Sequence, residues 1–150
     1  MVSLESIYED VDQHNIIIFQ YPLGDMADGA IIGNANGYGV FLDFSQYKTM
    51  RQYKAALIHE TSHCATGALH RVDSSFELVE RNEYKARRRS YEIYVPVNEI
   101  RQALRCGYTE PWQLADWFDL PEEDIKRALH YWVERRGVNF NDIYDYAVSE

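Results

Sequence analysis

The stretch His59-Glu60-Thr61-Ser62-His63 carries the pattern H-E-x-x-H. Residues four positions apart lie on one face of a helix, so both imidazole rings can reach the same cation. Glu60 lies about 100° around the helix from His59, which brings its carboxylate beside a bound metal rather than onto it. This pattern on a helix is typical of a zinc site with its own general base. It predicts His59 and His63 as metal ligands and Glu60 as the catalytic base.

The flanking residues predict that the motif lies in a helix from about Met50 to Thr66. Thr49 and Gln52 have the T-x-x-Q form of a capping box, and Gly67 is a typical helix stop. An apolar stripe follows at helical spacing: Met50, Tyr53, Ala56, Leu57 and Ala65.

The alternative is that both histidines are ordinary helix-face residues and that Glu60 is a solvated acid. A buried neutral histidine pair would need other partners, whereas zinc satisfies both rings at once.

A catalytic zinc normally takes three protein ligands, so a third is expected. Glu83 is our choice, because Ser74 and Glu77 form a second capping box that opens a helix with Glu83 in its interior. Small and apolar residues share much of the helix face that carries Glu83, and a carboxylate on such a face is either paired or metal-bound. The alternative partner is Arg87, four positions on.

These residues, together with Ala86 and Val95-Pro96, resemble the ImmA/IrrE family of metallo-endopeptidases. That family typically shows H-E-x-G-H, then E-x-x-A, a small residue four positions later, and a Leu-Met-Pro-like ending. Ser62 stands where glycine is common, and Ser90 replaces the small alanine. The resemblance is sharp over about residues 50–105 and only general elsewhere.

The resemblance implies an intracellular zinc endopeptidase of narrow specificity, often encoded on phages or mobile elements, that cleaves or otherwise inactivates a helix-turn-helix repressor. It carries over His59, His63 and Glu83 as zinc ligands and Glu60 as catalytic base. A second electrophile, a tyrosine or histidine, commonly assists in such sites. Here the candidates are His70, Tyr84 and Tyr91, which the sequence does not rank.

The expected fold class is α+β: a minimal zincin-like metalloprotease domain with a small mixed or antiparallel sheet on the motif helix. We expect a single domain over residues 1–150, strand-rich at about 15–44, with zinc-binding helices at about 50–95 and a helical part at about 98–136. A short helix around Leu4 to Asp12 precedes a buried strand in Asn15 to Tyr21. Gly29 to Gly33 and Tyr38 to Phe44 form a hairpin around an Asn-Gly turn. An edge strand of such a sheet can hold a substrate backbone.

The C-terminal part reads as three helices. Asn98 to Cys106 ends at Gly107, and Pro111 and Pro121 each stand at the first position of a helix. The stretch 112–125 invites a helix-turn-helix interpretation. Its second helix begins with three acids, Glu122, Glu123 and Asp124. Their negative charges would repel DNA phosphates, so a role in packing or partner recognition is favoured over DNA binding.

Composition agrees with a small cytoplasmic enzyme. The 150 residues carry a net charge of −9, no apolar run long enough to span a membrane and no N-terminal signal pattern. The acidic ends make nucleic-acid binding unexpected. Residues 81–89 are rich in arginine and lysine, which indicates either a solvated helix face or a dock for an acidic substrate segment. Cys64 and Cys106 read as unpaired, Cys64 as a small packed hydrophobe and Cys106 as a helix-end residue.

Two other functions remain open. A zinc-containing protein-binding module could sequester a repressor or toxin without proteolysis. A purely structural metal site is the third possibility, weakened by Glu60, which a closed site would not require.

Overall fold

The computed structural model describes residues 1–24, 29–71 and 73–141, which form helices and one small sheet. The chain groups into two compact units, residues 2–90 and residue 1 with residues 91 onward. The expected α+β class is confirmed, because a three-stranded sheet accompanies several helices. None of the helices in the described ranges is long and apolar enough to cross a membrane. The single domain over residues 1–150 stays a prediction.

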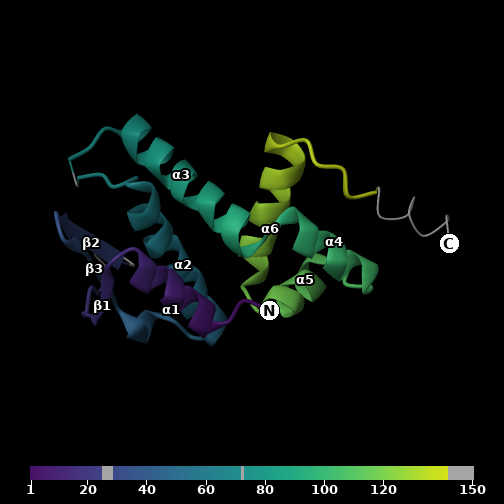
Figure 1. The fold of residues 1–150 in the computed structure, drawn as a ribbon, viewed down its shortest axis with the longest axis horizontal. Coiled ribbons are helices and arrows are strands. Elements are labelled where there is room, and N and C mark those ends of the chain that lie inside the picture. Colours follow the sequence, from purple (N-terminus) through teal and green to yellow (C-terminus); the bar gives the residue numbers. More distant parts are fainter. Residues whose placement is uncertain (25–28, 72, 142–150) are drawn as a thin grey trace. The chain divides into compact units, whose positions relative to one another are not determined.

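The first unit opens with helix α1, Leu4–Gln13, as expected. The Ser3 hydroxyl accepts a hydrogen bond from the Ser6 N–H at 3.1 Å, which caps the first turn. Ile7 and Val11 are buried. Figure 1 shows α1 beside α2, with the sheet at one end of this unit.

The sheet contains β1 (Ile16–Gln20), β2 (Gly29–Asn34) and β3 (Gly37–Leu42) in the order β1-β3-β2. The predicted hairpin is confirmed, since β2 runs antiparallel to β3 and Asn34 pairs with Gly37 across a two-residue turn. β1 runs parallel to β3. The sheet is therefore mixed, and β1 and β2 are its edges.

The predicted burial of the first strand is wrong for one of its faces. Ile16 is 5% exposed, but Ile17 and Phe19 are 62% and 43% exposed. Side chains alternate between the faces of a strand, and only one face of this sheet packs on the helices. On the other face Phe19 stacks on Phe41, with ring centroids 5.1 Å apart.

Helix α2, Met50–Thr66, has the predicted limits. Thr49 accepts from the Gln52 N–H, while the Gln52 side-chain oxygen accepts from the Lys48 N–H. Gly67 ends the helix with φ 64° in the left-handed region, as expected of a glycine stop.

The apolar stripe predicted for α2 differs from its buried face. Met50 is 56% exposed, whereas Lys54 is 2% exposed and donates to the Val2 carbonyl at 2.7 Å. Thr61 and Ser62 are fully buried. Polar groups can line this face because Lys54 and Ser62 find partners there.

Helix α3 runs from Phe76 to Tyr94. The predicted cap at Ser74 is wrong by one residue, since the hydroxyl of Ser75 accepts from the Leu78 N–H. Ser74 instead accepts from the Arg71 N–H in the preceding loop.

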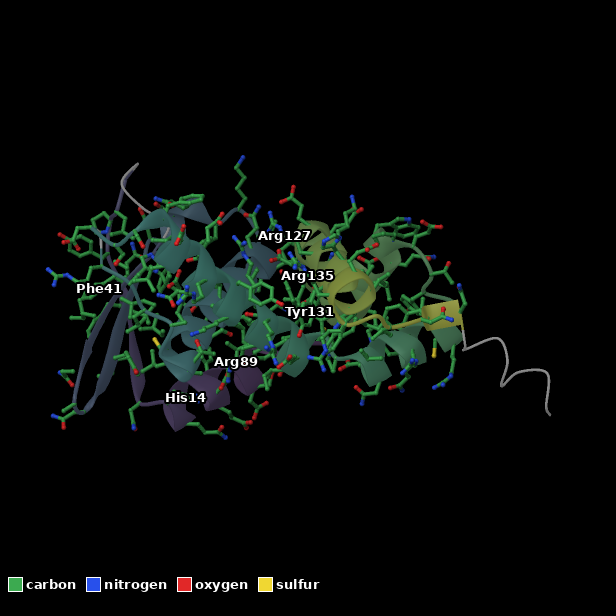
Figure 2. The ribbon with its side chains drawn as sticks, turned by 90° about the horizontal axis from the view of Figure 1, so that it is seen from above. His14, Phe41, Arg89, Arg127, Tyr131 and Arg135 are labelled. Carbon is green, nitrogen blue, oxygen red and sulfur yellow. The ribbon has the colours of Figure 1, made fainter. Side chains whose placement is uncertain are left out.

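The second unit contains α4 (Val97–Arg105), α5 (Pro111–Phe118) and α6 (Glu122–His130), which continues as a π-helical turn, η2 (Tyr131–Arg135). The three predicted helices are confirmed. Pro111 occupies the first helical position as expected, but Pro121 lies one residue before its helix, at the N-cap. Tyr131, labelled in Figure 2, donates to Glu92 at 2.8 Å.

Gly37 is required by the close approach of β3 to the chain before β1. A Cβ atom at this position would overlap the carbonyl oxygen of Asn15, which accepts the Tyr38 N–H. We expect Gly37→Ala to lower the free energy of unfolding by about 3 kcal/mol or more, because the backbone must shift. Gly24→Ala is the control: its φ is also positive at +59° but its surroundings are open, so it should cost roughly 1 kcal/mol. Equal losses in urea titrations of the two variants would contradict this account.

Candidate metal centre

The structure brings together the three predicted metal ligands. His59 and His63 lie one turn apart on α2, and their Nε2 atoms are 3.2 Å apart. The Glu83 carboxylate on α3 contacts both rings, with Oε2 3.0 Å from His59 Nε2 and Oε1 3.0 Å from His63 Nε2. The three residues offer ligand atoms within 4.8 Å of one another. A single ion can therefore be reached from all three side chains.

This donor set fits zinc. Zinc bonds of about 2.0–2.2 Å in a tetrahedral arrangement place neighbouring ligand atoms roughly 3.3 Å apart, close to the spacing found here. The Nδ1 atom of His63 lies 2.8 Å from the carbonyl oxygen of Ala68, a partner that holds the ring proton on Nδ1 and leaves Nε2 with a free lone pair. The three side chains thus form a possible metal site.

The two histidines of one motif have opposite shifts in pKa. Burial is the largest influence on His59 and works against its protonation, but the Glu83 hydrogen bond and the charges of Glu60 and Glu83 raise the pKa above its ordinary value. Burial and the nearby His59 lower the pKa of His63. The hydrogen bond with His59 is the main reason why the pKa of Glu83 falls to about 2. Of the two rings, His59 is therefore the one whose protonated form the Glu83 carboxylate favours.

Arg87, the alternative partner of Glu83, contacts the carboxylate less closely than the histidines do. Its Nη2 lies 4.0 Å from Glu83 Oε2, farther than either histidine, and its side chain is 53% exposed. Glu83 therefore faces the histidines first, and Arg87 adds a solvent-screened positive charge.

Small side chains let α2 and α3 approach each other next to the site. Ala86 and Ser62 are fully buried, and the Ser90 hydroxyl donates to the Ser62 hydroxyl at 3.0 Å. Ser62 and Ser90 are two of the positions at which the chain departs from the ImmA/IrrE pattern, Tyr94-Val95 being another. These two serines meet in space, where their hydrogen bond joins the two helices.

Arg89 is a structural residue that the sequence did not single out. Its guanidinium donates two hydrogen bonds to Asp10 on α1, at 2.7 and 2.9 Å, and a third to Ser62 at 3.2 Å. Its side chain is 16% exposed, so the interpretation of the whole basic run as a solvated face or dock is wrong for this residue. Figure 2 labels Arg89 and His14, both of which contact Asp10. The sequence held one clue: Asp10 lies three positions after Ile7 and directly before Val11, which puts an acid on the apolar side of the first helix.

Glu60 is on α2, and its carboxylate points toward the start of β2. Its Oε1 atom would be 3.0 Å from a Cβ atom placed on Gly29, the first residue of that strand. The side chain is partly exposed and does not belong to the group of possible ligands. It therefore lies outside the ligand group, over the sheet at the first residue of the edge strand β2, and it is close enough to His59 for its charge to raise the pKa of that ring.

The structure separates the three candidates for a second electrophile. The ring centroid of exposed His70 lies 6.2 Å from that of His63. Tyr84 follows Glu83 on α3 and is 43% exposed. Tyr91 belongs to the other unit and packs its ring on Tyr131. His70 is thus a candidate whose ring lies near a ligand.

The cysteines agree with their predicted roles. Cys64 is 3% exposed, and burial raises the pKa of its thiol to about 12, as expected for a packed hydrophobe rather than a ligand or nucleophile. Cys106 is exposed at the C-cap of α4.

Comparison of the chain with protein-family models, with curated proteins and with solved structures finds no match. The resemblance to ImmA/IrrE enzymes therefore stays a prediction that rests on the motif residues.

Removing one ligand should abolish tight metal binding. We expect His59→Ala and Glu83→Ala each to lose stoichiometric zinc in elemental analysis of the purified protein, because two remaining ligands hold the ion weakly. Glu80→Ala, an exposed acid on the same helix, is the matched control and should retain zinc. Full zinc occupancy in Glu83→Ala would exclude Glu83 as the third ligand.

Zinc affinity should rise with pH. His59 must lose its proton to bind the ion, and its pKa is raised, so protons compete with zinc until the pH exceeds that raised value. We expect affinity to increase by roughly tenfold per pH unit below it and to level off above it. Competition with a chelator between about pH 5.5 and 8 measures this. A flat profile would show that no ligand proton is displaced in this range.

Proposed function

We propose that this chain is a zinc-dependent endopeptidase of narrow specificity, with the zincin-like architecture of ImmA/IrrE enzymes. The observation that carries the proposal is the meeting of His59, His63 and Glu83, with Glu60 next to His59 on the same helix and acting on that ring by its charge. Two histidines and one carboxylate form a common catalytic zinc set that leaves a coordination position for water or substrate. An acid beside such a set is the general base of metalloproteases.

The residues divide the chemistry between them. Zinc, when bound, supplies Lewis-acid polarisation of the reacting oxygen atoms. His59, His63 and Glu83 hold it, and Ala68 orients the His63 ring. Glu60 takes the proton from the attacking water and later gives it to the leaving amine, so its own protonation state is restored after each turnover.

Strand β2 is suited to holding the substrate backbone. It is an edge of the sheet, and its first residue lies against Glu60. An extended peptide that added to this edge would be fixed by main-chain hydrogen bonds and brought to the general base. Such pairing reads the side chains of the peptide only weakly, so selectivity would come from contacts elsewhere on the substrate protein.

The proposed substrate is a helix-turn-helix repressor, by analogy with the resembled family, and the proposed setting is the cytoplasm. Direct nucleic-acid binding is not part of the proposal, because the first turn of α6 presents three acids: Glu122, Glu123 and Asp124.

Glu60→Gln separates proteolysis from sequestration. The amide keeps the shape of the side chain but cannot accept the proton, so we expect zinc and partner binding to be retained while cleavage falls at least about 100-fold. The assay incubates the zinc-loaded protein with the helix-turn-helix repressor encoded beside it and identifies fragments by mass spectrometry. Glu80→Gln is the matched control and should cleave as the wild type does.

The alternative function makes the opposite prediction. If both wild type and Glu60→Gln inactivate the repressor and no fragments appear, the chain acts by sequestration and the peptidase proposal is wrong.

A further inference from the structure

Asn82 is a buried polar residue directly before the third ligand. It lies on α3, is 5% exposed, and its side-chain amide donates to the Leu69 carbonyl oxygen at 2.9 Å. A buried amide is costly unless it is hydrogen-bonded, so this contact fixes where the loop after α2 runs.

The same loop holds the His63 ring. The neighbouring carbonyl, that of Ala68, lies 2.8 Å from His63 Nδ1, and the Ala68 N–H donates to the His63 carbonyl at 3.1 Å. Ala68 is 3% exposed. The loop is thus attached to His63 at one residue and to α3 at the next.

We propose that Asn82 is a positioning residue for metal binding. It acts through the Leu69 and Ala68 carbonyls on the ring of His63, and so couples the helix of Glu83 to the orientation of a ligand on α2. This inference rests on the proposed zinc site and adds a role that the ligand motif does not contain. Outer hydrogen bonds of this kind fix the ring orientation and the tautomer of a ligating histidine.

Loss of the Asn82 amide frees the Leu69 carbonyl and loosens the loop. The Ala68 carbonyl then no longer holds the His63 ring with Nε2 toward the other ligands. Removing such an outer partner typically lowers metal affinity by about 10- to 100-fold. We expect this loss in Asn82→Leu, which keeps the branched arrangement of four side-chain heavy atoms, and in Asn82→Ala.

The test measures zinc affinity by chelator competition, the visible spectrum of the Co²⁺-loaded protein, and thermal unfolding of the metal-free protein. Ser90→Ala is the matched control: it removes a hydrogen bond between α2 and α3 but touches neither the loop nor a ligand. We expect the Asn82 variants to bind zinc at least about tenfold more weakly and to shift the Co²⁺ bands, with Ser90→Ala close to wild type.

Affinities within threefold of wild type would overturn the inference. So would an equal loss in Ser90→Ala, or a loss that follows the melting temperature of the metal-free protein, because either would make Asn82 a merely structural residue. Should Asn82→Leu fail to fold, Asn82→Ser replaces it under the same criteria. If the wild-type protein binds no zinc, both this inference and the proposed function are wrong. If the wild type binds zinc and the Asn82 variants bind it equally well, only this inference is wrong.

Discussion

The ion pair between Arg89 and Asp10 is the interaction on which the geometry of the site depends. The guanidinium of Arg89, on α3, donates to Asp10 on α1 and to Ser62 on α2, so one side chain joins three helices. A buried charge is expensive to leave unpaired, and removing one partner of such a pair typically costs about 3–5 kcal/mol. An arrangement of the helices that separated Arg89 from Asp10 would carry this free-energy cost, so the pair restrains how α3 lies against α2. Since Glu83 is on α3 and the histidines are on α2, the ligand geometry follows from this helix packing.

What the sequence predicted well is set by neighbours along the chain. The limits of α2, its glycine stop and the hairpin between β2 and β3 follow from caps, turns and side-chain periodicity, which act over a few residues. The facing of His59 and His63 follows in the same way from four-residue spacing. The choice of Glu83 needed information beyond local spacing, because it relied on the small residues of a second helix and on the family resemblance.

What the sequence missed depends on contacts between distant segments. Asp10 and Arg89 are 79 positions apart, and the buried Lys54 reaches Val2 across 52. The exposed face of β1 follows from its place at the edge of a sheet that helices cover on one side, and a run of isoleucines does not reveal that place. The shift of the α3 cap from Ser74 to Ser75 is the usual uncertainty between adjacent residues of equal capping ability.

The arrangement around Glu60 is the strongest physical support for hydrolysis over a closed structural site. Within the described ranges, the possible ligand group contains three residues, whereas a structural zinc usually has four protein ligands. Cys64, the nearest soft donor in sequence, is buried and does not belong to that group. Glu60 follows the ligand His59 on α2, and its carboxylate lies against Gly29, the first residue of the edge strand β2. Neither a closed metal site nor a sequestering surface needs an acid at that point, but a peptide paired with β2 would need a base there to be cleaved.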